Sequence, residues 1–211
     1  MLKAPVELLN GTAHSSIIFL HGLGADGTDL LPVAQALQLT GVRFILPNAP
    51  NRAVTINNGY VMPAWYDITT SNITLNQDNT GFNQSRAVVA GLIELEISRG
   101  IATNRIVLAG FSQGGAVALY SGLTLNIELA GIVGLSAYLP QLIVAQTMPP
   151  IWIGHGRDDE VIPVATSQAS FASLPTALAQ IHLYPIGHAI STAEIADLRA
   201  WLLTRLPPAD T

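Results

Sequence analysis

The chain of 211 residues carries a formal net charge of −5, with 49% hydrophobic and only 11% charged residues. Its basic residues are scattered singly, which argues against binding of nucleic acid, and the absence of cysteine excludes disulfides, thiol catalysis and cysteine–metal sites. Glycine or polar residues interrupt every apolar stretch before about 18 clean apolar residues accumulate, so we expect no membrane-spanning helix.

The length favours a single domain over residues 1–211, built on one sizeable core. So few charges in such an apolar chain are typical of a parallel sheet that is buried on both faces. The same composition leaves room for a homodimer interface, an apolar substrate groove or transient contact with a membrane surface. Residues 1–10 contain no long apolar run, so we expect no signal peptide and a cytoplasmic protein.

Strand and helix patterns alternate along the chain, which favours an α/β fold with a mostly parallel central sheet and helices on both faces. Short apolar runs predict strands at residues 16–20, 42–46, 105–109, 131–135, 151–154 and 180–184. Helical spacing predicts helices at about residues 29–39, 82–99, 113–120, 164–173 and 192–206. Residues 48–80 show no sustained period, and long connections of this kind are usually lids or binding loops.

The segment Gly110-Phe111-Ser112-Gln113-Gly114 lies between an expected strand and an expected helix. A Gly-x-Ser-x-Gly pattern at such a junction is typical of the nucleophile elbow of α/β-hydrolases. A chain of this composition matches the bare pattern by chance about one time in ten. Its position between strand and helix therefore makes Ser112 the candidate nucleophile.

A serine nucleophile needs a base, and the base needs a carboxylate that orients it. In α/β-hydrolases these groups follow in the order serine, acid, histidine. Asp158 and Asp159 follow the expected strand at 151–154, and His188 follows the next strand. The carboxyl ends of parallel strands meet at one edge of the sheet. We therefore predict His188 as the base and favour Asp159 as the acid, with Asp158 as the alternative.

The remaining histidines have structural explanations. His14 precedes the first expected strand and His182 lies within a strand, so we expect both to be structural. His21 and His155 each precede a glycine in an expected turn, where we expect them to organise the backbone.

Residues 22–27 match the Gly-x-Gly-x-x-Gly fingerprint of dinucleotide-binding proteins. That fingerprint requires an acid about 20 residues further on, where this chain has Leu46-Pro47-Asn48, so we reject nucleotide binding. In a serine hydrolase, a loop after an early strand supplies one amide of the oxyanion hole, and the residue after the nucleophile supplies the other. We therefore predict the backbone amides of Leu23 and Gln113 as the donors.

Four segments, in order along the chain, resemble the phospholipase/carboxylesterase family of α/β-hydrolases, which includes the acyl-protein thioesterases and small bacterial carboxylesterases. They are residues 20–27 (LHGLGADG), 62–68 (MPAWYDI), 109–116 (AGFSQGGA) and 184–188 (YPIGH). The resemblance implies an α/β-hydrolase fold and hydrolysis of carboxylic esters or thioesters without a cofactor. The implied substrates are small-molecule or lipid-like acyl esters of short to medium chain, lysophospholipids or acylated proteins. The resemblance also implies Asp159 as the acid, and an acyl pocket flanked by the segment around Trp65.

Residues 57–78 carry more aromatic and aliphatic side chains than a solvated loop needs. We expect them to form one wall of the acyl pocket, with contacts from Trp65, Ile68, Ile73 and Leu75. The alternative for Trp65 is that it anchors the loop to the core. We expect no metal, because the chain has no cysteine and no histidine pair at helical ligand spacing. The alternative function is a catalytically silent binding protein of the same fold, which the complete set of Ser112, Asp159 and His188 argues against.

Overall fold

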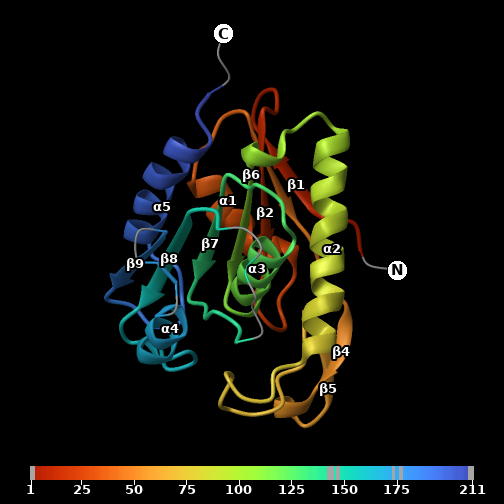
Figure 1. Ribbon diagram of the computed structural model, residues 1–211, viewed down its shortest axis with the longest axis vertical. Helices are drawn as coiled ribbons and strands as arrows, with labels where there is room; N and C mark the ends of the chain where they lie inside the picture. The colour runs from red at the N-terminus through yellow and green to blue at the C-terminus, as the bar shows by residue number, and fades with distance from the viewer. Residues whose placement is uncertain (1–2, 142–144, 146–147, 173, 176–177, 209–211) are drawn as a thin grey trace.

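A seven-stranded sheet in the order β1-β3-β2-β6-β7-β8-β9 runs through the computed structural model (Figure 1). The structure describes residues 3–141, 145, 148–172, 174–175 and 178–208. The strands are β1 (Val6–Leu9), β2 (Ser15–Leu20), β3 (Val42–Leu46), β6 (Ile106–Phe111), β7 (Gly131–Leu135), β8 (Ile151–Gly156) and β9 (Ala179–Tyr184). Only β1 pairs antiparallel, with β3, and all other neighbours are parallel. The predicted mostly parallel sheet is therefore confirmed.

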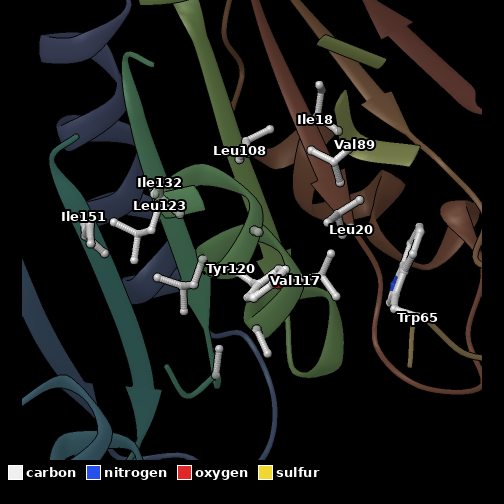
Figure 2. Close-up of a cluster of buried hydrophobic side chains, with 14 of the residues drawn as sticks. Ile18, Leu20, Trp65, Val89, Leu108, Val117, Tyr120, Leu123, Ile132 and Ile151 are labelled. Atoms are coloured by element: carbon white, nitrogen blue, oxygen red, sulfur yellow. The ribbon is translucent and has the colours of Figure 1, made fainter. Parts of the chain in front are cut away.

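Five α-helices of the described residues cover the two faces of this sheet: α1 (Leu31–Ala36), α2 (Asn79–Ser98), α3 (Gln113–Thr124), α4 (Val164–Phe171) and α5 (Thr192–Arg205). Side chains of a strand point alternately to opposite faces. Accordingly Ile18 and Leu20 of β2 pack with α2 and α3, whereas Ile17 and Phe19 pack with α1 and α5. Figure 2 shows the α3 side of this core, where strand side chains such as Leu108 meet helix residues. Helices on both faces were predicted, and this arrangement confirms them.

Two features of the fold were not predicted from the sequence. The edge strand β1 is half exposed and only four residues long, so its apolar pattern is weak. Within the connection at 48–80, β4 (Asn51–Val54) and β5 (Tyr60–Pro63) form a separate two-stranded sheet. Both strands carry mostly exposed or half-buried side chains, so the apolar alternation that identifies a half-buried strand is missing.

Helix boundaries differ from the predictions by a few residues. The helix expected from about residue 29 begins as a 3-10 helix at Gly27–Leu30, and α1 ends at Ala36, because Gln38 has a left-handed backbone with φ of 47°. The helix expected at 164–173 is observed as α4, which ends at Phe171. Residue 173, the last residue of the expected helix, lies outside the described residues. No helix in the described ranges is long and apolar enough to cross a membrane.

Glu96, near the end of α2, is a fully buried carboxylate that ties this helix to the sheet. Its Oε1 lies 3.3 Å from Nη1 of Arg43 on β3 and 2.8 Å from Nη1 of Arg99. Its Oε2 accepts a hydrogen bond from the hydroxyl of Ser16 on β2. A buried charge is tolerated only when it is paired and hydrogen-bonded, so these contacts fix where α2 crosses the sheet.

We predict that Glu96→Ala lowers the free energy of unfolding by about 2–3 kcal/mol, because the substitution leaves Arg43 and Ser16 without their buried partner. Chemical denaturation measures this change. Glu94→Ala is the matched control on the same helix, where the side chain is exposed, and it should change stability by no more than about 0.5 kcal/mol. Equal effects of the two substitutions would show that Glu96 does not tie the helix to the sheet.

Candidate active site

Ser112 occupies a sharp turn between β6 and α3, with φ of 54° and ψ of −120°. A serine rarely adopts a positive φ, and such strain costs about 1–3 kcal/mol. A Cβ at Gly110 would lie 2.2 Å from the carbonyl carbon of Gly114, and a Cβ at Gly114 would lie 2.2 Å from the carbonyl oxygen of Leu20. Glycine is therefore required on both sides of Ser112, as the elbow interpretation expects.

The structure brings Ser112, His188 and Asp159 into one chain of contacts at the carboxyl edge of the sheet. His188 Nε2 lies 3.0 Å from Ser112 Oγ, and His188 Nδ1 lies 2.8 Å from Asp159 Oδ2. The Asp159 side chain is fully buried, whereas 18% of the His188 side chain is exposed. Because a hydrogen on Nδ1 points to the carboxylate, Nε2 is free to accept the hydroxyl proton.

Asp158 does not share this arrangement. Its side chain is exposed, and its backbone amide donates to the carbonyl of Ile186 in the loop that carries His188. Asp159 instead accepts at Oδ1 from the amides of Val161 (2.9 Å) and Ile162 (2.8 Å). The geometry therefore favours Asp159 over Asp158 as the partner of His188.

The loops after β8 and β9 are packed directly against each other. A Cβ at Gly156 would lie 2.2 Å from the carbonyl oxygen of Gly187 and 2.3 Å from that of Ile186. The amide of Arg157 donates to the carbonyl of Tyr184 at 2.8 Å. This close approach carries Asp159 and His188 to the same place, although they are far apart in sequence.

Leu23 and Gln113, whose backbone amides are the predicted oxyanion-hole donors, both line the cavity beside Ser112. A Cβ at Gly22 would lie 3.5 Å from Ser112 Cβ, so the loop that carries Leu23 passes beside the serine. Gln113 is the first residue of α3, and amides in the first turn of a helix have no partner within the helix. In the described part of the chain, neither amide donates to a protein acceptor.

The side chain of Gln113 holds the loop that faces the serine. Its Oε1 accepts from the Trp65 amide and its Nε2 donates to the Tyr66 carbonyl, both at 2.8 Å. His21 holds the start of the loop that carries Leu23: its Nε2 accepts from the Ala49 amide, and its Nδ1 contacts the Gly22 carbonyl at 2.7 Å. Burial lowers the pKa of His21, so the neutral ring can make both contacts. His21 therefore organises the backbone, as expected.

The structure places Trp65 in the core and not in the wall of the cavity beside Ser112. Its ring is fully buried near Leu20 (Figure 2), and its Nε1 donates to the His21 carbonyl at 2.9 Å. The Trp65 carbonyl accepts from the hydroxyl of Ser85. The expectation that Trp65 contacts the acyl chain was therefore wrong for this geometry, and the alternative of a core anchor describes its position.

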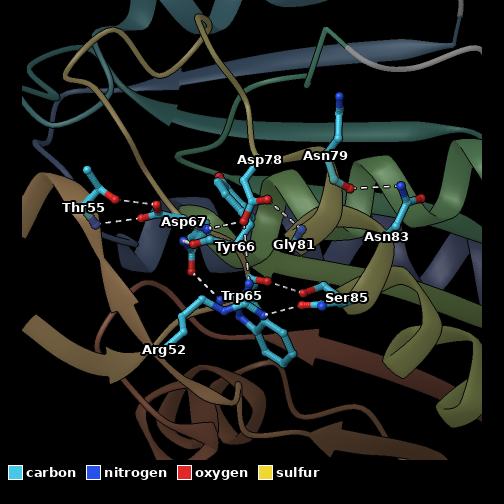
Figure 3. Close-up of polar contacts among 12 residues, drawn as sticks. Arg52, Thr55, Trp65, Tyr66, Asp67, Asp78, Asn79, Gly81, Asn83 and Ser85 are labelled. Carbon is cyan, nitrogen blue, oxygen red and sulfur yellow. Dashed lines mark hydrogen bonds and ion pairs between the residues drawn. The ribbon is translucent and has the colours of Figure 1, made fainter. Parts of the chain in front are cut away.

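Polar contacts hold the connection between β5 and α2 in place (Figure 3). Asp67 accepts from the Thr55 amide at 2.7 Å, and the Asp67 amide donates to Asp78 Oδ2 at 2.9 Å. Asp78 Oδ1 accepts from the Gly81 amide at 2.9 Å and so caps α2, while Arg52 lies 3.7 Å from the same carboxylate. The loop that faces Ser112 is thus fixed at both of its ends.

An apolar cavity of about 320 Å³ opens beside Ser112 and His188. Ile68 and Ile73 of the predicted wall segment line this cavity, whereas Leu75 is 54% exposed and lies outside it. Its other lining residues are Gly22, Leu23, Ala25, Asp29, Tyr66, Phe111, Gln113, Tyr138, Val161 and Ile162. Larger hollows of about 510 and 720 Å³ elsewhere do not include Ser112.

Sequence reasoning missed several of these wall residues. Val161 and Ile162 follow Asp159 directly and Tyr66 follows Trp65, so proximity to the predicted motifs could have identified them. Tyr138 carries no such signal. Its hydroxyl lies 2.8 Å from that of Tyr66, and burial raises the pKa of Tyr138 to about 12 and that of Tyr66 well above its ordinary value. Both phenols are therefore uncharged at neutral pH, which keeps this part of the wall apolar.

Within the described ranges, no group of three or more histidine, aspartate or glutamate side chains is arranged to hold a metal ion. The expectation that no metal or other cofactor takes part stays a prediction. His14 contacts Arg105 at 2.8 Å and His182 stacks on Trp152, positions that fit the structural roles expected for both.

Comparisons with known proteins agree with this architecture. The phospholipase/carboxylesterase family model matches residues 3–206. The acyl-protein thioesterase 1 of Cryptococcus neoformans is 37% identical over 224 residues, which cover 92% of this chain and 94% of that protein. The crystal structure of acyl-protein thioesterase 2 from Zea mays superposes with a TM-score of 0.85 at 27% identity, covering 96% of this chain and 98% of that one. The α/β-hydrolase fold is thereby confirmed, and the chain belongs to the phospholipase/carboxylesterase family.

Proposed function

We propose that this protein is a serine hydrolase that cleaves carboxylic esters or thioesters through an acyl-enzyme on Ser112. One observation carries the proposal: the continuous chain from Asp159 through His188 to Ser112, with contacts of 2.8 and 3.0 Å, beside an apolar cavity. An aligned nucleophile, base and orienting acid is the arrangement that activates a serine hydroxyl.

The first half of the reaction forms the acyl-enzyme. Ser112 Oγ attacks the carbonyl carbon of the substrate while His188 Nε2 takes its proton. The carbonyl oxygen becomes an oxyanion that accepts hydrogen bonds from the amides of Leu23 and Gln113, and donors fixed in advance stabilise this charge at little reorganisation cost. The bond between the former carbonyl carbon and the leaving oxygen or sulfur then breaks, and His188 gives its proton to the leaving alcohol or thiol.

The second half releases the acid. Water attacks the Ser112 ester and gives a proton to His188 Nε2, and a second oxyanion forms at the same two amides. The bond to Ser112 Oγ then breaks, and His188 returns the proton to the serine. Asp159 keeps its charge throughout and stabilises the imidazolium that forms twice in each cycle.

The cavity favours an apolar acyl group as the part of the substrate that binds. Ile68, Ile73 and Ile162 contribute aliphatic wall, and the two paired tyrosines add no charge. The thioesterase names of the relatives at 37% identity support a thioester as one substrate class, and the carboxylesterase description of the family supports oxyesters. A series of acyl chain lengths on matched oxyesters and thioesters distinguishes the two preferences.

We predict that Ser112→Ala lowers kcat for a p-nitrophenyl ester by about 10⁴–10⁶, as removal of the nucleophile does in related triads. A fluorophosphonate probe should label the wild type and not the variant. Ser98→Ala, at an exposed position on α2, serves as the control and should retain full activity. Full activity of Ser112→Ala would refute the proposal, and absence of turnover by the wild type would favour the silent binding protein instead.

Substitution of the two neighbouring acids tests the partner of His188. We predict that Asp159→Asn lowers kcat by about 10⁴, because the amide no longer holds the imidazole in its working tautomer, while Asp158→Asn changes kcat by less than about tenfold. Steady-state kinetics on both purified variants gives the answer. The opposite ranking would assign the role to Asp158.

The residues of the cavity wall should determine how activity depends on acyl-chain length. Ile73→Ala should lower kcat/KM for longer acyl chains more than for acetyl esters, because each buried CH₂ contributes up to about 0.8 kcal/mol. Leu75→Ala, whose side chain lies outside the cavity, is the matched control and should treat all chain lengths alike. Trp65→Ala should lower the melting temperature and reduce activity uniformly. A selective loss on long chains in Trp65→Ala, with none in Ile73→Ala, would mean that the acyl group binds elsewhere.

A further inference from the structure

His155 is a buried histidine next to the proposed catalytic acid. Sequence reasoning placed it in a turn, whereas it lies within β8 and is fully buried. Its Nε2 lies 2.8 Å from the carbonyl oxygen of Ile162 and 3.3 Å from Oδ2 of Asp159. The ring therefore contacts both the acid and the backbone three residues after it.

The protonation state of His155 follows from these neighbours. A neutral imidazole carries a single N–H. Both acceptors lie at Nε2, and Nδ1 is buried with no partner among the described residues. The hydrogen therefore sits on Nε2 and donates to the Ile162 carbonyl. A second hydrogen on Nδ1 would be a buried donor without an acceptor, and burial lowers the pKa of His155, so the ring stays neutral.

Most side chains of the loop after β8 are exposed, although the amides of Arg157 and Asp158 donate to Tyr184 and Ile186. Arg157, Asp158, Glu160 and Val161 are exposed, whereas Asp159 and Ile162 point inward. The amide of Ile162 donates to Asp159 Oδ1, while its carbonyl accepts from His155. Ile162 is therefore held on both sides of its backbone, once by the acid and once by a side chain on a rigid strand.

We propose that His155 is a positioning residue for the reaction, acting through the chain from its Nε2–H to the Ile162 peptide and on to the Asp159 carboxylate. It fixes the loop so that Asp159 Oδ2 stays in line with His188 Nδ1. This inference rests on the proposed function, because it assigns a role to His155 only if Ser112, His188 and Asp159 carry the reaction.

Three variants test the proposal. His155→Leu removes the donor, and His155→Gln places an amide N–H near the position of Nε2. His182→Leu removes the neighbouring histidine of β9, which stacks on Trp152. The substrate is p-nitrophenyl acetate, whose acetyl group is too short to need the Ile162 side chain. Active sites are counted by fluorophosphonate titration, and the melting temperature is measured for each variant.

We expect His155→Leu to lower kcat per titrated site by about 10- to 100-fold, the scale expected when a reacting group is misplaced by about 1 Å, with KM changed by less than about threefold. His155→Gln should recover most of this loss. His182→Leu should lower the melting temperature and leave kcat per site unchanged. If His155→Leu does not fold, His155→Asn takes its place in the comparison with His155→Gln. The shorter amide of asparagine cannot reach the Ile162 carbonyl.

The proposal is overturned if kcat per site in His155→Leu, or in its replacement, equals that of His182→Leu, or if Gln gives no recovery. This failure is distinct from failure of the proposed function. If the proposed function fails, Ser112→Ala remains active. If only the His155 proposal fails, Ser112→Ala is inactive while the His155 variants keep their turnover.

Discussion

The junction between β6 and α3 leaves no space for a side chain at Gly110 or Gly114, and the proposed site depends on that close approach. Gly114 lies against the carbonyl of Leu20, and Gly110 lies against the first turn of α3. Ser112 turns between these two contacts with a φ of 54°. The loop after β2 passes beside it, because a Cβ at Gly22 would lie 3.5 Å from Ser112 Cβ. The strain is offset by the core that fixes both elements, since α3 is buried along almost its whole length.

The order of the strands then determines what else can reach the serine. Leu23 lies in the loop after β2, which neighbours β6. Asp159 and His188 lie in the loops after β8 and β9, on the other side of β6. All four strands are parallel, so these groups meet at one edge. Gln113 connects the serine turn to the loop before α2. It lines the cavity, and its side chain forms hydrogen bonds with the Trp65 amide and the Tyr66 carbonyl. A change at any of these contacts is expected to displace several groups of the site together.

Much of this was predictable from sequence where an element is buried and its pattern strong. Buried strands such as β7 were predicted with their observed bounds, and strand ends located Asp159 and His188. The missed elements, β1 and the β4–β5 pair, lie at the margins, where exposed side chains leave no apolar period. Trp65 was misplaced because an aromatic residue in a long loop packs equally well on a ligand or on the core. Tyr138 meets Tyr66 across 72 positions of the chain, a contact that only the folded arrangement reveals. His155 lies only four residues before Asp159, but its burial within β8 was hidden because the His-Gly pair suggested a turn.

In the proposed reaction, Ser112 is acylated while its oxyanion is held by the amides of Leu23 and Gln113. A crystal structure of the protein after reaction with an alkyl phosphonate ester tests it most directly, because the phosphoryl oxygen mimics the oxyanion of the acyl-transfer transition state. The account predicts phosphorus bonded to Ser112 Oγ, its oxygen about 2.7–3.1 Å from both amide nitrogens, and the alkyl chain in the cavity lined by Ile68 and Ile73. A phosphonate on another residue, or an oxygen directed away from both amides, would contradict it.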